Sequence, residues 1–139
     1  MAKVILNMIT NIVQEYITAI NRQDLGTMRA LMTEDHEFVD AGDGHYSGRD
    51  EILKGWPDYY DMFPDYAIEV SEILEHDDRV VVFGHASATY RNLKNPANSN
   101  SWRIPAAWKA IVRNNKIAYW QVFCNYSSIH EIMLRNDPG

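Results

Sequence analysis

Apolar side chains near the start of the chain recur at steps of three and four. They are Ile5, Met8, Ile9, Ile12, Val13, Tyr16, Ile17 and Ile20. This spacing predicts an amphipathic helix of more than four turns with these residues on its buried face. The polar run 21–24 ends that helix, and Leu25, Met28, Leu31 and Met32 predict a short second one.

A short alternating segment connects the second predicted helix to a third. Residues 36–40 alternate as a strand, and the glycines and aspartate within 41–44 predict a tight turn. Residues 47–51 open a helix that carries Ile52, Leu53 and Trp56 inward. Pro57 falls inside this helix and is expected to kink or split it, because proline lacks the N–H that a helical hydrogen bond needs.

The second half of the chain changes to a period of two. The segments 67–75, 79–91, 101–113 and 116–126 are rich in β-branched and aromatic residues and predict four strands. Residues 114–115 predict a two-residue hairpin turn, and residues 95–100 a longer polar loop. No repeat or linker divides the sequence, so residues 1–139 are expected to form a single α+β domain in which a curved antiparallel sheet wraps around three N-terminal helices.

The alternation also assigns faces to the strands. The faces expected to be buried are Trp102, Ile104, Ala106, Trp108, Ala110 and Val112 in one strand, and Val80, Val82, Gly84, Ala86, Ala88 and Tyr90 in the strand before it. Gly84, Ala86 and Ala88 are small for the middle of a packed strand. Either a helix packs closely against them or the space is left for a ligand.

Composition and charge narrow the possible partners. Thirteen Lys and Arg residues against 19 Asp and Glu give a net charge of −6, which argues against nucleic acid and anionic membranes. The first apolar run is interrupted at Asn7, Thr10 and Asn11, so no signal peptide or membrane span is expected and the predicted location is cytoplasmic.

Cys124 is the only cysteine. Neither a zinc-binding pattern nor a glycine-rich phosphate loop occurs, so neither metal nor cofactor is expected.

Several local motifs follow one another along nearly the whole chain. They are Tyr16-Ile17, the run 21–25, Phe38-Val39-Asp40, the run 46–52, Trp56, Phe63-Pro64-Asp65, Asp78-Arg79-Val80 and the run 116–120. In this order they resemble the SnoaL-like and ketosteroid isomerase-like branch of the nuclear transport factor 2-like superfamily. The resemblance implies a cone-shaped barrel whose sheet wraps around the helices and leaves an apolar cavity open at one end.

The resemblance also implies roles for individual residues. In ketosteroid isomerases a tyrosine of the first helix and an aspartate of the first strand flank the substrate, and Tyr16 and Asp40 match them. Asp40 would move a proton between carbon atoms while the Tyr16 hydroxyl donates to the enolate oxygen. The second acid of those isomerases corresponds to Trp108, so one carboxylate is expected in the cavity. The residues expected to bind the substrate are Phe38, Trp56, Gly84, Ala86, Ala88, Trp108, Trp120, Val122 and His36.

Each of these residues also has a purely structural interpretation. Asp40 is well placed to cap the turn at 41–44, Tyr16 is on the buried face of its helix, and His36 is either a proton-transfer group or an inward histidine bonded to a carbonyl.

The expected function is cofactor-independent proton transfer, of the isomerase, cyclase or dehydratase type, on an apolar carbonyl-bearing ring compound. The alternative is a non-catalytic domain for ligand binding or dimerisation. Relatives dimerise through the outer sheet face, where Phe83 is expected, so a homodimer is predicted.

Overall fold

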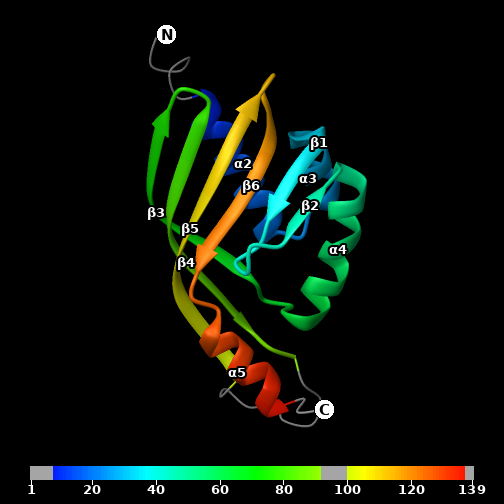
Figure 1. Ribbon diagram of the computed structural model, residues 1–139, viewed down its shortest axis with the longest axis vertical. Helices are drawn as coiled ribbons and strands as arrows, with labels where there is room; N and C mark the ends of the chain where they lie inside the picture. The colour runs from blue at the N-terminus through cyan, green and yellow to red at the C-terminus, as the bar shows by residue number, and fades with distance from the viewer. Residues whose placement is uncertain (1–7, 92–99, 137–139) are drawn as a thin grey trace.

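The computed structural model describes residues 8–91 and 100–136. Its elements are α2 (Met8–Asn21), α3 (Leu25–Leu31), β1 (Met32–Val39), β2 (His45–Ser47), α4 (Arg49–Met62), β3 (Ala67–His76), β4 (Arg79–Thr89), β5 (Ser101–Arg113), β6 (Lys116–Cys124) and α5 (Ser127–Asn136). The helices gather beside a curved sheet, with α2 and α3 behind its long strands and α4 alongside β1 and β2 (Figure 1). This arrangement confirms the predicted α+β fold.

The predicted helices form close to the expected places. Ile12, Val13 and Tyr16 of α2 are buried as the spacing predicted, whereas Ile5 lies outside the described residues. Asp24 caps α3 by accepting a hydrogen bond from the backbone N–H of Thr27 at 3.1 Å. Pro57 does not split α4, which continues to Met62. The missing proline N–H removes one hydrogen bond of this helix, and the remaining turns on either side hold it together.

The sheet differs in two details from the predicted antiparallel barrel. The six described strands have the order β2-β1-β6-β5-β4-β3, so the sheet is open, with β2 and β3 at its edges. The β1–β6 pair is parallel, which makes the sheet mixed. Alternation within each strand defines its faces but not the direction of its neighbour, and a parallel pair needs the long connection that the chain between β1 and β6 provides. The three residues of β2 are too few to show alternation and were not predicted.

A fourth helix, α5, follows the last strand and was not predicted. It lies at the end of the long strands (Figure 1) and buries Ile129, Ile132 and Asn136. The Asn136 side chain donates a hydrogen bond to the Asn100 side chain at 2.9 Å. The polar loop predicted at 95–100 falls almost wholly outside the described residues.

The glycine at position 84 is explained neither by a closely packed helix nor by space for a ligand, the two alternatives that the sequence offered. A β-bulge between Val70 and Glu72 brings the β3 backbone over β4. A Cβ atom built on Gly84 would lie 1.8 Å from the carbonyl oxygen of Glu69. Glycine is therefore required by the neighbouring strand, and not by a helix or a ligand.

The core lies between the helices and the inner sheet face. Trp102, Trp108, Val80 and Val82 are buried on that face as predicted. On the opposite face, Phe83 is 40% exposed, which agrees with the strand alternation. Across the described parts of the chain, no helix combines the length and apolar character needed to cross a membrane.

Candidate functional site

A cavity of about 900 Å³ lies between the inner sheet face and the helices, with walls from α2, β1, α4, β6 and α5. Its volume is in the range of small-molecule sites. Nine of the described residues that line it are aromatic: Tyr16, Phe38, Tyr46, Trp56, Tyr59, Tyr66, Trp102, Trp120 and Tyr126. Ala86, Ile104, Val122 and Cys124 continue the sheet side of the wall. The cavity is therefore rich in aromatic side chains, and the tyrosine hydroxyls are among its polar groups.

Tyr16 reaches the cavity from the buried face of α2. Its ring meets Trp120 edge to face, with 5.2 Å between the ring centroids. Burial raises the pKa of the Tyr16 phenol above its ordinary value, so the hydroxyl keeps its proton at neutral pH. Within the described chain this hydroxyl has no hydrogen-bond partner, which leaves its O–H free to donate to a ligand.

Asp40 lines the cavity from the end of β1 and also holds the following turn. One carboxylate oxygen, Oδ1, accepts from the backbone N–H groups of Gly42 at 2.9 Å and Gly44 at 2.8 Å. The other oxygen, Oδ2, accepts from the Tyr46 hydroxyl at 3.2 Å. The turn-capping interpretation is thus realised, and Oδ2 is the oxygen with capacity for a further partner.

Of the residues expected to contact a ligand, Phe38, Trp56, Ala86, Trp120 and Val122 line the cavity. His36, Gly84, Ala88 and Trp108 do not. Gly84 lies under the β3 backbone, and Ala88 pairs with Trp102, whose larger ring forms the wall there. Trp108 is buried beside Tyr66, so Tyr66 and not Trp108 meets the cavity. Strand alternation identified the correct face for these residues, but not which side chains another residue covers.

His36 is fully buried behind the cavity wall. Its Nδ1 lies 2.7 Å from the Ile117 carbonyl oxygen, which can only accept, so Nδ1 carries the proton. Burial lowers the pKa of His36 below its ordinary value, more than the Ile117 hydrogen bond and the nearby Asp35 raise it. The Nε2 atom has no partner among the described groups. This is the carbonyl-bonded histidine that was one of the two sequence interpretations.

The sequence pattern did not predict a group of polar side chains around the cavity that includes Tyr59, Tyr66, Tyr126 and Cys124. Burial raises the pKa of all four, so the phenols and the thiol keep their protons. Tyr59 and Tyr66 lie on either side of Phe63-Pro64-Asp65, one of the motifs that carry the family resemblance. This motif was the signal in the sequence that pointed to their part of the chain. Tyr126 lies between the end of β6 and the start of α5, where it lines the cavity next to Cys124 and Asn125.

Trp102 adds a second donor to the cavity wall. It is 7% exposed, and its indole N–H has no hydrogen-bond partner in the described structure. A buried donor without a partner is costly, and a ligand oxygen would satisfy it.

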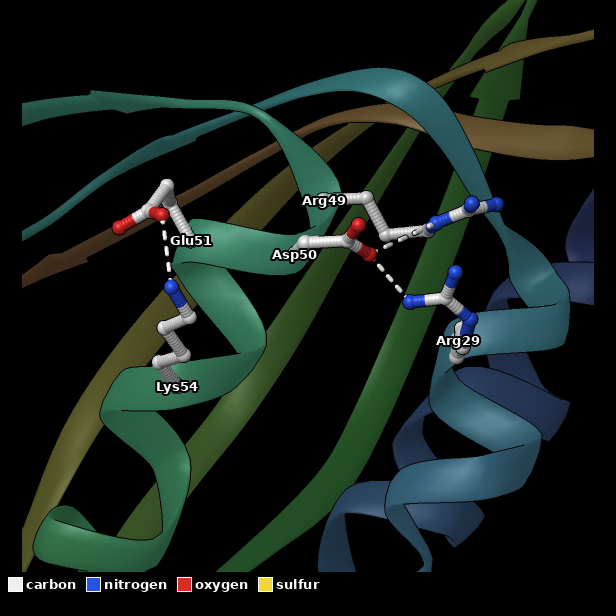
Figure 2. A network of polar contacts seen from close by, with 5 residues as sticks. All are labelled: Arg29, Arg49, Asp50, Glu51 and Lys54. Atoms are coloured by element: carbon white, nitrogen blue, oxygen red, sulfur yellow. Dashed lines mark hydrogen bonds and ion pairs between the residues drawn. The ribbon is translucent and has the colours of Figure 1, made fainter.

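Charge at the cavity comes from two carboxylates. Besides Asp40, Glu51 in the first turn of α4 lines it, which was not predicted. Figure 2 shows Glu51 paired with Lys54 and the neighbouring Asp50 paired with Arg29 of α3. The Glu51–Lys54 ion pair is 2.9 Å long, and Asp50 also lies 3.6 Å from Nε of Arg49. None of the described residues that line the cavity is Lys, Arg or His. The described chain also has no cluster of three side chains suited to holding a metal ion.

Solved structures share this architecture. A proposed polyketide cyclase from Xanthomonas campestris pv. campestris is 21% identical, with a TM-score of 0.79 over 91% of this chain and 97% of that one. A protein with a ketosteroid isomerase-like fold from Catenulispora acidiphila, solved with trimethylamine, is 18% identical, with a TM-score of 0.74 over 91% and 92%. An LEH-like epoxide hydrolase from M. tuberculosis is 12% identical, with a TM-score of 0.76 over 94% and 92%. At these identities the likeness establishes the fold and not the reaction.

Comparison with models of protein families, and not with individual proteins, identifies the family. A search among curated proteins found no match to this sequence. Residues 13–120 match the SnoaL-like domain family, and this range contains α3, α4, strands β1 to β5 and the first half of β6. The chain therefore belongs to the SnoaL-like domain family.

Proposed function

We propose that this protein catalyses proton transfer on an apolar, carbonyl-bearing ring compound, with Asp40 as the base and Tyr16 as the hydrogen-bond donor. The observation that carries the proposal is that a carboxylate oxygen and an unpartnered phenol line the same aromatic cavity. A carbanion beside a carbonyl forms readily when a base takes its proton and a donor meets the oxygen that receives the charge.

The reaction can be written for a β,γ-unsaturated ketone. Oδ2 of Asp40 takes a proton from the carbon between the carbonyl and the double bond, and the C–H electron pair becomes part of an enolate. The enolate oxygen accepts hydrogen bonds from Tyr16 and from the indole N–H of Trp102. Protonated Asp40 then returns the proton to the γ-carbon, which gives the conjugated enone with no change in composition.

The test is to follow enone absorbance with a panel of β,γ-unsaturated cyclic ketones. Asp40→Asn should lower the rate by about 100-fold or more, because a positioned base contributes about 10²- to 10⁴-fold. The asparagine keeps an oxygen that can cap the turn, so circular dichroism should be unchanged. The matched control is Asp43→Asn, since Asp43 lies in the same turn, is exposed and does not line the cavity. Equal rates for wild type and Asp40→Asn would refute the proposed base.

The second candidate function is non-catalytic binding of a small apolar ligand. Its supporting observation is that both Asp40 oxygens already accept hydrogen bonds within the turn. On this alternative, ligands raise the melting temperature by mass action without product forming, and Asp40→Asn changes affinity only slightly.

We also propose that the outer sheet face binds a second copy of the chain. Phe83, Ala107 and Phe123 are register neighbours across β4, β5 and β6, and both phenylalanines are exposed. Glu72 on β3 and Lys109 on β5 flank this apolar strip with opposite charges. A twofold axis through the strip would bring each charge near its opposite on the partner, as a self-complementary interface requires.

A further inference from the structure

The charged side chains that line the cavity itself are both acidic. Asp40 and Glu51 are the only ionisable acids or bases, apart from tyrosines and Cys124, among the described residues that line it. A ligand carrying a carboxylate or phosphate would meet repulsion from Asp40, and none of the described lining residues is basic.

The two carboxylates differ in how far they are neutralised. Glu51 forms an ion pair with Lys54 on the next turn of α4 (Figure 2). Asp40 has no Lys, Arg or His within ion-pair distance in the described structure, and its partners are two backbone N–H groups and the Tyr46 hydroxyl. Its negative charge at the cavity is therefore not compensated by a cation of the protein.

Aromatic rings surround this carboxylate. The Tyr46 ring stacks on Phe38 with centroids 5.9 Å apart, and both line the cavity. Tyr126 also lines the cavity, and burial raises the pKa of its phenol with smaller contributions from the nearby Cys124 and Asp40. Aromatic faces carry partial negative charge and attract ammonium groups, most strongly where water is partly excluded.

We propose that the ligand of this cavity carries a positively charged nitrogen, a protonated amine or quaternary ammonium, held near Asp40 by the rings of Phe38, Tyr46 and Tyr126. This inference rests on the proposed function only in taking the same cavity as the ligand site. Coulombic attraction acts over several ångströms, so the nitrogen is held on the Asp40 side of the cavity without having to contact the carboxylate.

The test compares three aromatic probes of matched shape by isothermal titration calorimetry. They are (2-naphthylmethyl)trimethylammonium, its neutral carbon analogue 2-neopentylnaphthalene and the anion 2-naphthylacetate. In low-salt buffer the cation should bind about tenfold more tightly than the neutral analogue, and the anion more weakly than both. About 0.5 M NaCl should reduce the advantage of the cation and leave the neutral probe unaffected.

Variants assign the preference to Asp40. Asp40→Asn should remove most of the cation advantage while the affinity for the neutral probe stays within about twofold, because the shape of the turn is kept. Asp43→Asn should behave as wild type, since its carboxylate is exposed and outside the cavity.

Three results would overturn the inference: a neutral probe that binds as tightly as the cation, an anion that binds as tightly, or a cation preference that survives in Asp40→Asn. If the cation preference is found but no ketone is isomerised, the proposed chemistry fails and this inference stands. If ketones are isomerised without any cation preference, the reverse holds.

Discussion

At the scale of single residues, His36 shows how burial decides protonation. The Ile117 carbonyl requires a proton on Nδ1, and the surrounding apolar groups, including the Tyr16 ring with its centroid 6.2 Å away, give no partner to Nε2. A second proton would place a full charge in this environment with only Asp35 nearby to offset it. His36 is therefore a neutral structural group of the wall behind Tyr16.

This predicts a pH dependence of stability. The pKa of His36 is lowered in the folded state, whereas in the unfolded chain it is about 6.5. The unfolded state thus binds more protons as the pH falls below about 6.5, and the free energy of unfolding decreases by up to about 1.4 kcal/mol per pH unit from this group. Urea denaturation between about pH 7.5 and 5 measures the slope.

His36→Asn should flatten that slope, because its amide can still donate to Ile117 but does not titrate. It should also lower stability at neutral pH through the lost ring. His130→Asn is the control, because the His130 side chain is exposed on α5 and forms no ion pair in the described structure, so the slope should stay nearly as in wild type. A His36→Asn variant with the wild-type slope would contradict the assignment.

At the scale of elements, β3 and β4 show that a small residue in a strand has more than one cause. Mid-strand glycine is compatible with a close helix, a ligand or a close backbone, and only the bulge in β3 selects the third. The same limit applies to Pro57, because the sequence indicates the lost hydrogen bond but not how well the packing of Trp56 and Tyr60 holds α4 together.

Gly84→Ala should therefore destabilise the protein by at least about 2 kcal/mol, since the added methyl group would overlap the Glu69 carbonyl and force the strands apart. Gly55→Ala is the matched control. Gly55 lies within α4, and a Cβ there would meet nothing within 4 Å. It should raise stability by about 0.5–1 kcal/mol through helix propensity. Thermal or urea unfolding compares the two, and a neutral Gly84→Ala would contradict the close strand approach.

At the scale of the whole molecule, the two faces of the sheet have different uses. The inner face contributes to the core and the cavity, and the outer face presents Phe83 and Phe123 to solvent. Exposed aromatic neighbours in one strip favour association, which is the basis of the proposed dimer.

Sedimentation velocity at micromolar concentration tests this association. Wild type should sediment as a dimer, and Phe123→Ser combined with Phe83→Ser should shift the population to monomer while circular dichroism stays unchanged. Leu134→Ser is the control, because Leu134 is equally exposed but lies on α5, away from the sheet face. A wild-type protein that is monomeric at this concentration would refute the dimer.

The sequence by itself determined the first three helices, the long strands, the buried faces of α2, β4 and β5, and the family. These properties depend on hydrophobic periodicity and turn residues, which are local and can be read along the chain. Tertiary structure alone decided which side chains share the cavity. Asp40 and Tyr126 line the same cavity, and His36 donates to the Ile117 carbonyl, only because β1 pairs in parallel with β6. Such neighbours are set by strand order and register, which alternation within one strand does not encode.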